Sequence, residues 1–164
     1  GLTMGMQPIV GYNFGAQKMD RVKQTLRLGI ISGVVITSSG FVICEFFPHA
    51  VSALFTDSDE LINLAVEGIR LAVLMFPFVG AQIVIGNFFQ SIGKAKISIF
   101  LSLTRQLLYL LPCLLLFPQW WGLKGVWISM PVSDALAFVT AVISLMIYIK
   151  KVSKEHPIAN KVAE

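Results

Sequence analysis

The stretch Gly11-Tyr12-Asn13-Phe14-Gly15-Ala16 decides the fold, because an apolar segment ends there and charge begins. The cations that follow directly are Lys18, Arg21, Lys23 and Arg27. A new apolar segment then starts at Leu28. Two apolar segments joined by a short, basic, glycine-containing stretch are typical of two membrane-crossing helices and the turn between them. Lys and Arg beside short loops mark the cytoplasmic side, so this turn predicts the orientation of everything after it.

The composition indicates that lipid is the main solvent of this chain. Hydrophobic residues make up 55% of it, charged residues only 13%, and the mean hydropathy is +0.76. Too few polar side chains remain to cover the surface of a soluble protein of 164 residues. The net charge of +4 does not indicate nucleic-acid binding, because the cations stand at the ends of apolar runs, where anionic headgroups attract them. Cys44 and Cys113 lie far apart inside apolar runs and indicate neither a disulfide framework nor a metal site.

The apolar runs predict an all-α fold, a polytopic transmembrane bundle of roughly five helices, one partial and four full. The partial helix covers residues 1–16, and its apolar part gives only roughly 21 Å of helix against a hydrocarbon core of roughly 30 Å. We therefore expect the chain to start inside a helix whose beginning is missing. The full spans are predicted at about 28–47, 61–92, 97–117 and 126–149. Residues 1–151 would form one membrane domain, followed by a polar cytoplasmic tail at 152–164.

Small residues predict where the helices pack closely. In the first helix they form two pairs at four-residue spacing, Gly1 with Gly5 and Gly11 with Gly15. This spacing allows a close approach to another helix, although an ordinary glycine-rich helix end explains it equally well. Gly29 and Gly33, with Thr37 one turn later, favour packing in the next span, and the hydroxyl is expected to bond back to its own helix.

The apolar run at 61–92 is longer than one helix needs to cross the bilayer, and it contains a proline and two charged residues. Pro77 predicts a kink in it, and Pro112 and Pro131 are further kink candidates. Glu67 and Arg70 lie within one turn of each other near the outer end, where we expect a solvated or interfacial pair rather than a transport site.

The charges alternate between the two ends of the predicted spans. The inner segments hold the orientation residues Lys18, Arg21, Lys23, Arg27, Lys94 and Lys96, together with the lysines of the tail. The stretch from Asp57 to Glu60 holds no cation and should lie outside. The outer loop at 118–125 contains Lys124 and two tryptophans that suit the headgroup level. This sorting predicts a multi-pass protein of the cell membrane with a cytoplasmic carboxy-terminal tail.

Two charged residues are expected near the middle of the bilayer. Arg105 lies about 13 Å of helix from Lys96, and Asp134 lies about 12 Å from Val126 on the following, antiparallel span. A cation at that depth costs on the order of 3 kcal/mol unless it is compensated. We therefore predict that Arg105 and Asp134 face the bundle interior and either pair directly or border one polar cavity. A purely structural ion pair and a substrate or ion pathway both remain open.

Other polar residues are candidates for the same pathway. Tyr109, one turn beyond Arg105, and Gln106 are expected to add hydrogen-bond donors to such a cavity. Gln82, Asn87 and Gln90 lie deep in the long run, where hydrogen bonding between helices is the favoured interpretation and cavity lining the alternative.

Catalytic signatures are absent from the sequence. It contains no HExxH, GxSxG or Walker A motif and no paired Cys/His set, so we expect neither an enzyme nor a resident cofactor or metal. Transport would then depend on a gradient or on a partner.

These residues resemble the carboxy-terminal lobe of the multidrug and toxic compound extrusion (MATE) family. Gly5-x-Gln7-Pro8-Ile9-Val10-Gly11-Tyr12-Asn13-Phe14-Gly15-Ala16, followed by Arg21, is similar to the end of the eighth helix and the next loop. The later matches in order are Leu54-Phe55-Thr56, Pro77, Gln90-Ser91-Ile92-Gly93-Lys94-Ala95, Arg105-Gln106 with Pro112, and Gly122-x-x-Gly125-Val126-Trp127 with Pro131 and Asp134. The resemblance extends to about Lys151.

The resemblance implies a twelve-helix antiporter of two six-helix lobes that exports organic, often cationic, drugs against a Na⁺ or H⁺ gradient by rocking between two states. This chain would be most of one lobe, and its partners would be the lipid bilayer, the amino-terminal lobe and seventh helix of the same protein, and a small drug-like substrate. Some members carry an ion-binding carboxylate in the tenth helix. The equivalent stretch here, Leu71 to Ile92, has no Asp or Glu, which leaves the coupling ion open.

Two other functions compete with drug antiport. A flippase of a related superfamily, which moves a lipid-linked precursor, would be favoured by a groove lined with several cations, and one Arg in mid-membrane is weak support for it. A membrane scaffold without transport activity would be favoured if 164 residues were the natural length. The reading frame upstream of Gly1 separates these cases, because a transporter requires about seven further spans there.

Overall fold

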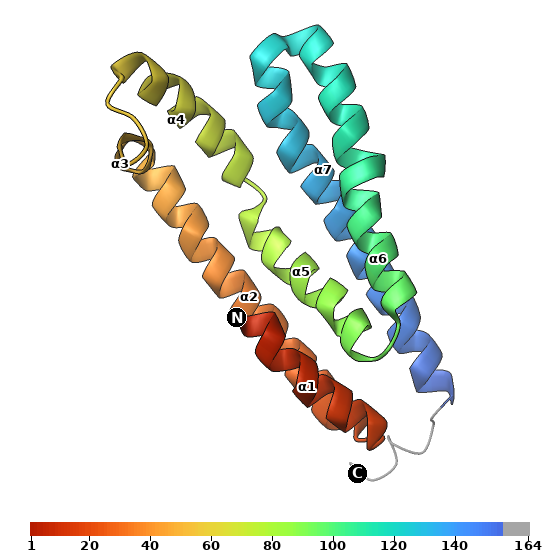
Figure 1. Cartoon of the computed structure of the whole chain (residues 1–164). Helices are drawn as coiled ribbons and strands as arrows, with labels where there is room; N and C mark the ends of the chain where they lie inside the picture. The colour runs from red at the N-terminus through yellow and green to blue at the C-terminus, as the bar shows by residue number, and fades with distance from the viewer. Residues whose placement is uncertain (156–164) are drawn as a thin grey trace.

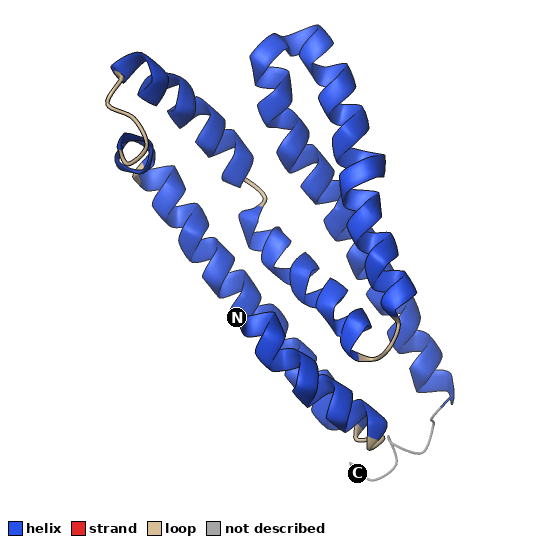
Figure 2. Ribbon diagram, viewed as in Figure 1, coloured by secondary structure: helices blue, strands red, loops and turns tan. Residues whose placement is uncertain are grey.

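The structure is a computed structural model that describes residues 1–155. Each regular element in this part of the chain is a helix, as Figures 1 and 2 show, so the predicted all-α fold is confirmed. The elements are α1 (Leu2–Gly15), α2 (Met19–Phe46), α3 (Pro48–Ala53), α4 (Asp59–Val73), α5 (Phe76–Ser91), α6 (Ala95–Leu103), the π-helix η1 (Thr104–Leu110) and α7 (Leu111–Glu155). Of the predicted tail, residues up to Glu155 continue α7, and 156–164 lie outside the described residues.

Length and composition identify the membrane crossings. Met19–Phe46 and Ala95–Val152 are each long and apolar enough to span a bilayer, and the bent pair α4 and α5 can form one further span. The stretch Ala95–Val152 holds 58 residues, about 87 Å of helix or nearly three bilayer cores. It doubles back at Gly122, where φ is 55° and ψ is −136° (Figure 1). Within residues 1–155, the fold is therefore a short helix followed by four crossings.

The turn at Gly122 replaces the predicted outer loop. We expected residues 118–125 to form a loop, but the helical conformation continues on both sides of this single glycine. A residue with a side chain is strongly disfavoured at these backbone angles, so glycine permits the reversal within one residue.

The first turn is shorter than expected. Helix α2 begins at Met19, so Arg21, Lys23 and Arg27 lie in its first turns rather than in the connection. Hydropathy placed the start of the span at Leu28, because exposed cations at a helix end lower the apolar average without interrupting the helix. These cations are therefore helical, but they lie at the same end of the bundle as predicted.

The predicted kink at Pro77 is present. Helix α4 ends at Val73, α5 begins at Phe76, and the two axes differ by 50°. Pro77 occupies the first turn of α5, where its missing N–H breaks no helical hydrogen bond. Pro112 comes directly after the π-helical segment, and Pro131 lies inside α7, so a kinking role for these two stays a prediction.

Helix α5 is the centre of the bundle. The α2 and α5 backbones approach each other at Gly33 and Gly80, where an added Cβ on Gly80 would meet the Gly33 carbonyl and the Thr37 hydroxyl. Thr37 donates its hydroxyl proton back to the Gly33 carbonyl at 2.9 Å, as predicted. The glycines of residues 1–15 do not form a packing stripe within the described residues, because Gly1, Gly5 and Gly15 have open space around them and only Gly11 faces another helix, at the Ser91 carbonyl.

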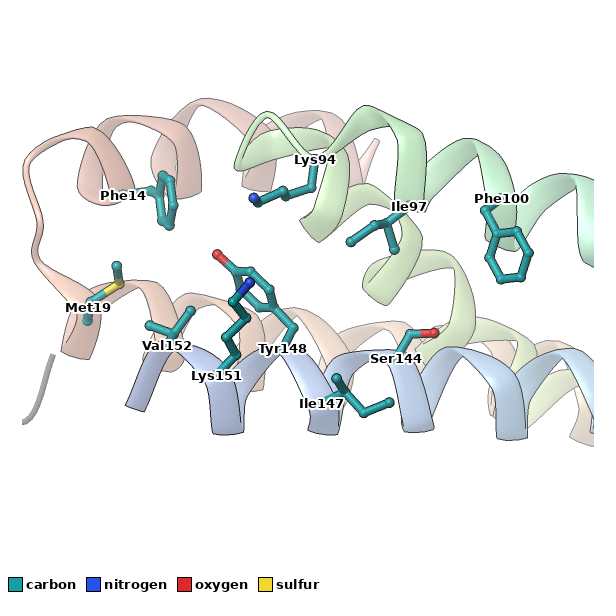
Figure 3. Close-up of a pocket in the computed structure, with 10 residues that line it drawn as sticks. All are labelled: Phe14, Met19, Lys94, Ile97, Phe100, Ser144, Ile147, Tyr148, Lys151 and Val152. Carbon is teal, nitrogen blue, oxygen red and sulfur yellow. The ribbon is translucent and has the colours of Figure 1, made fainter. Parts of the chain in front are cut away.

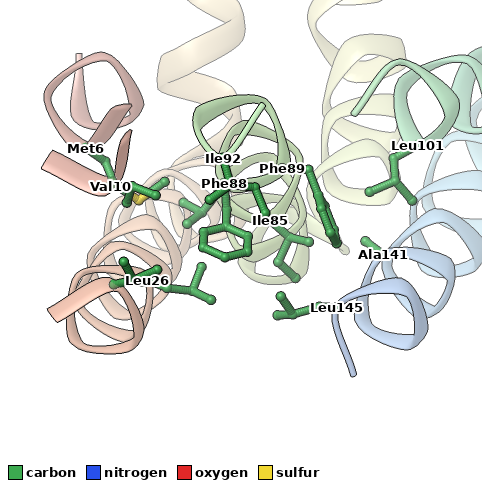
Figure 4. Close-up of a cluster of buried hydrophobic side chains, with 12 residues drawn as sticks. Met6, Val10, Leu26, Ile85, Phe88, Phe89, Ile92, Leu101, Ala141 and Leu145 are labelled. Atoms are coloured by element: carbon green, nitrogen blue, oxygen red, sulfur yellow. The ribbon is translucent and has the colours of Figure 1, made fainter. Parts of the chain in front are cut away.

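Buried apolar side chains from α1, α2, α5, α6 and α7 form one core around the inner half of α5 (Figure 4). The largest fully buried side chain is Phe89, whose ring packs edge-on against Tyr148 of α7. Many other large apolar side chains are exposed, among them Phe46, Phe47, Leu108 and Ile147. An apolar outer surface is what a hydrocarbon solvent favours, whereas water would penalise it.

The helix connections gather at two ends. The connections of α1 to α2 and of α5 to α6 lie at one end with the last turn of α7, and the α3–α4 region and the Gly122 hairpin lie at the other (Figure 1). The first end, which we call the basic end, carries the cations Lys18, Arg21, Lys23, Arg27, Lys94, Lys96, Lys150 and Lys151. The acidic stretch from Asp57 to Glu60 is at the opposite end, as the alternation of charge predicts.

Candidate functional site

Arg105 and Asp134 form a direct ion pair inside the bundle. The Arg105 Nε atom donates a hydrogen bond to Asp134 Oδ1 at 2.8 Å, and its Nη2 atom lies 2.8 Å from the same oxygen. The Asp134 side chain is only 9% exposed, whereas the Arg105 side chain keeps 35% of its surface open. The contact predicted from the depths of the two residues is therefore confirmed. Its role in transport stays a prediction.

The guanidinium comes from an unusual helical segment. Arg105 lies in η1, where seven residues adopt π-helical geometry. Such segments are rare and often occur at functional sites. Pro112 offers a local cause, because its ring clashes with the carbonyl four residues earlier and it lacks an N–H for an α-helical bond. The neighbouring Thr104 is 3% exposed, and its hydroxyl has no hydrogen-bond partner.

Arg105 borders a polar cavity of about 260 Å³ between α5 and α6. The cavity is lined by Gln82, Ile83, Gly86, Asn87, Gln90, Ser98, Leu101, Ser102 and Arg105. Three of the predicted pathway candidates, Gln82, Asn87 and Arg105, thus meet at one space. Asp134 is connected to it through the guanidinium of Arg105.

The amide groups do not make the hydrogen bonds between helices that we favoured from sequence. Asn87 Nδ2 donates to the Ile83 carbonyl of its own helix at 2.9 Å. Gln82 is 7% exposed, and its Oε1 atom has no partner. Cavity lining, the alternative, is the arrangement observed. A buried amide oxygen without a partner requires a donor, which water or a ligand in the cavity would supply.

Sequence reasoning missed Ser98 and Ser102, which line the cavity. They precede Arg105 by seven and three residues, a spacing that places all three on one face of a helix. The signal was present in the sequence, but isolated serines in an apolar run are usually packing residues.

Tyr109 lies outside the cavity lining and forms a separate contact. Its Oη atom is 2.8 Å from Thr140 Oγ1. Because the Thr140 proton goes to the Leu136 carbonyl, Tyr109 acts as the donor in this pair. Gln106 is exposed and does not line the cavity, so the expectation that both would add donors there is wrong.

The outer charged residues pair differently from the prediction. Glu67 Oε1 lies 2.6 Å from Lys124 Nζ, and Arg70 Nε lies 3.8 Å from Glu45 Oε1. The predicted pairing of Glu67 with Arg70 is therefore wrong, because the outer end of α4 lies between α2 and α7 and each side chain finds a partner on a neighbouring helix. All four side chains are more than one third exposed. Such pairs contribute little stability.

The part of the chain that the structure describes contains no group of three or more His, Cys, Asp or Glu side chains able to hold a metal. Cys44 and Cys113 are free thiols. The site consists of one partly buried ion pair, one polar cavity and the helices that hold them.

Comparison with known proteins gives consistent matches. The MatE family model matches residues 1–115. The multidrug export protein MepA of Staphylococcus aureus (strain MSSA476) is 24% identical over 153 residues, which cover 91% of this chain and 32% of MepA. The FAD transporter of Shewanella oneidensis is 23% identical over 139 residues, covering 82% of this chain and 30% of its own length. The chain therefore spans about a third of these relatives.

Solved structures share the fold. A multidrug resistance MATE family transporter of the MOP superfamily superposes with a TM-score of 0.86 in its inward-facing conformation, at 18% identity over 93% of this chain and 36% of that one. The outward-facing conformation gives the same TM-score and identity, and the match covers 35% of that chain.

Proposed function

Because this chain belongs to the MatE family, we propose that it forms part of one lobe of a secondary transporter that exports small organic molecules by cation-coupled antiport. Members of the family are multi-pass membrane transporters, and the relative from Staphylococcus aureus is named a multidrug export protein. The remaining lobe and the rest of this one would be supplied by sequence that this chain does not contain, since it spans about a third of its relatives.

The observation that carries this proposal is the polar cavity beside the Arg105–Asp134 pair. Charged residues inside a membrane bundle are costly and usually mark a pathway for substrate or ions. At about 260 Å³ the cavity is smaller than typical sites for drug-sized ligands, which hold roughly 300–1,000 Å³. It therefore suits a coupling ion, several waters or one end of a substrate. A complete drug site would require walls from the other parts of the transporter.

The ion pair offers a coupling mechanism. Asp134 Oδ1 accepts both contacts from Arg105. A proton, Na⁺ or a cationic substrate that reaches Asp134 competes with the guanidinium for this carboxylate. Exclusive occupancy of one carboxylate by either coupling ion or substrate is the condition that antiport requires.

The two conformations of the solved transporter support a rocking motion. Inward-facing and outward-facing forms match this chain with the same TM-score of 0.86. A lobe that keeps its fold in both states can move as a rigid body. We propose that this segment belongs to such a body, with the basic end facing the cytoplasm of the cell membrane.

The test uses the complete gene that contains this chain, expressed in a drug-sensitive host. Arg105→Ala and Asp134→Asn should each remove resistance when variants are compared at equal amounts of protein in the membrane, as measured by immunoblotting. Arg70→Ala is the matched control, because it breaks an exposed ion pair at the outer end. Unchanged resistance in both test variants would overturn the proposal. Reconstituted protein with an imposed H⁺ or Na⁺ gradient then identifies the coupling ion.

A further inference from the structure

A second cavity, of about 500 Å³, opens at the basic end, away from the Arg105–Asp134 pair. It is lined by Phe14, Met19, Lys94, Ile97, Phe100, Ser144, Ile147, Tyr148, Lys151 and Val152, as Figure 3 shows. These residues come from the end of α1, the start of α2, the α5–α6 connection, the start of α6 and the last turns of α7. We call this space the basic-end groove.

The groove has a cationic part. The Lys94 ammonium, the Lys151 ammonium and the Tyr148 hydroxyl extend into the same space in Figure 3. The Tyr148 ring is fixed by edge-on packing against Phe88 and Phe89, so its hydroxyl is held in place. The two amino groups and the hydroxyl make this part suitable for an anionic group rich in oxygen acceptors.

The surroundings add to this positive field. The basic end carries further cations on the first turns of α2, on Lys96 and on Lys150, while its acidic residues among 1–155 are Asp20 in α2 and Glu155, the last residue of α7. Positive charge clustered at the end of a transmembrane bundle attracts the anionic lipids of the adjacent leaflet.

The remaining wall is apolar and continues toward the middle of the bundle. Ile97, Phe100 and Ile147 form this side, and Phe100 and Ile147 are 53% and 64% exposed. An inorganic anion would contact the lysines and leave this wall without a partner. A ligand with an anionic head and an aliphatic chain contacts both parts of the groove.

We propose that the basic-end groove binds an anionic glycerophospholipid, with the phosphate between Lys94 and Lys151 and an acyl chain along Ile97, Phe100 and Ile147. The charge of the lining selects against zwitterionic headgroups, and the position at the end of the bundle matches the headgroup level of a bilayer. The groove has a different lining from the cavity beside the Arg105–Asp134 pair, and this proposal does not depend on the proposed function.

The test measures lipid retention by native mass spectrometry of the complete purified protein that contains this chain, after exchange into vesicles of phosphatidylcholine with phosphatidylglycerol. We expect retained phosphatidylglycerol to exceed phosphatidylcholine at least tenfold at equal supply. Lys94→Gln with Lys151→Gln should lower phosphatidylglycerol retention by about 25-fold, since each of the two lysines that would contact the phosphate contributes roughly a fivefold preference. Lys96→Gln with Lys150→Gln is the matched control, because it removes the same charge from the same end but outside the groove.

Two further probes separate a lipid site from simpler alternatives. Glycerol phosphate, which has the head without the chain, should not displace phosphatidylglycerol at equal concentration, and displacement would overturn the acyl-chain contact. Equal losses in the groove and control variants would overturn the site and leave only a diffuse surface charge. Circular dichroism checks that each variant keeps its helices. If the double groove variant does not fold, Lys94→Gln alone replaces it. A threefold loss of phosphatidylglycerol retention in this variant supports the proposal, and no loss overturns it.

Discussion

At the scale of single residues, the Arg105–Asp134 pair raises the question of whether it serves stability, transport or both. Removing one partner of a buried pair usually costs about 3–5 kcal/mol, because the other charge remains without compensation. Arg105 retains 35% exposure of its side chain, so water partly compensates it. We therefore expect Asp134→Asn to lower the free energy of unfolding by about 3 kcal/mol, the lower limit of this range.

The first prediction compares this single change with a double replacement. Asp134→Asn should lower the melting temperature of the purified protein by roughly 6–12 °C, at about 2–4 °C per kcal/mol for a chain of this size. Arg105→Met with Asp134→Leu removes both charges and should recover most of the loss. If the pair is part of the pathway, the double variant of the complete transporter is stable but does not export drug. Full activity of the stable double variant would show that the pair is only structural.

The second prediction concerns the contact between Tyr109 and Thr140. Tyr109→Phe removes the donor, while Thr140 keeps its bond to the Leu136 carbonyl. Hydrogen bonds between membrane helices contribute about 0.6 kcal/mol on average, so the melting temperature should fall by roughly 1–3 °C. Tyr12→Phe is the control, because Tyr12 is 74% exposed and should show no change. A decrease of more than about 5 °C would mean that Tyr109 supports the neighbouring ion pair as well.

At the scale of helices, the close approach of α2 and α5 depends on the absence of side chains. A Cβ on Gly80 would collide with the Gly33 carbonyl, which cannot move away without displacing the α2 backbone, and with the Thr37 hydroxyl, which would have to leave its bond to that carbonyl. Gly86 lies in the same helix, and a Cβ there would meet no atom within 4 Å. The two glycines therefore form a matched pair.

The third prediction follows from this contrast. Gly80→Ala should destabilise the protein by about 1–3 kcal/mol through overpacking, which lowers the melting temperature by roughly 2–12 °C. Gly86→Ala should be neutral or stabilising by up to about 1 kcal/mol, because alanine restricts the unfolded chain and favours helix. Thermal unfolding in detergent measures both. Equal changes in melting temperature for the two substitutions would mean that helix propensity, and not the contact between α2 and α5, determines the stability of this region.

The helices illustrate what sequence reasoning could and could not predict. The spans and the hinge at Pro77 followed from bilayer thickness and from the missing N–H of proline, which act locally. The start of α2 at Met19 did not follow, because hydropathy cannot distinguish a charged helical turn from a charged loop. The hairpin at Gly122 was predicted as a longer loop, because the sequence does not show that one glycine is enough to reverse the chain.

The candidate site was predicted in part. The contact between Arg105 and Asp134 could be predicted, because two antiparallel spans cross the same bilayer and the distance of each residue from the end of its span gives its depth. Which face a polar side chain takes depends on how the helices rotate against each other, which the sequence does not give. Gln82 and Asn87 were therefore assigned to hydrogen bonds between helices, whereas they line a cavity. The Tyr109–Thr140 contact and the partners of Glu67 and Arg70 depend on the same rotations.

At the scale of the whole molecule, the arrangement of charge determines how the bundle sits in the membrane. The connections at the basic end carry lysines and arginines, and the α3–α4 connection carries Asp57, Asp59 and Glu60 (Figure 1). Positively charged loops remain on the cytoplasmic side during insertion. The four crossings fix these two sets of connections on opposite sides, so the orientation of one determines that of the other.

The fourth prediction tests this orientation by cysteine labelling of intact cells. In a background with Cys44→Ser and Cys113→Ser, Asp57→Cys should react with a membrane-impermeant maleimide added outside. Lys94→Cys should react only after the cells are permeabilised, because it lies in the connection at the opposite end. Both positions are exposed in the structure, so a difference in labelling reports the side of the membrane and not burial. The reverse pattern would contradict the positive-inside orientation alone. Labelling of both positions from one side would contradict the number of crossings, and with it the shared depth that brings Arg105 to Asp134.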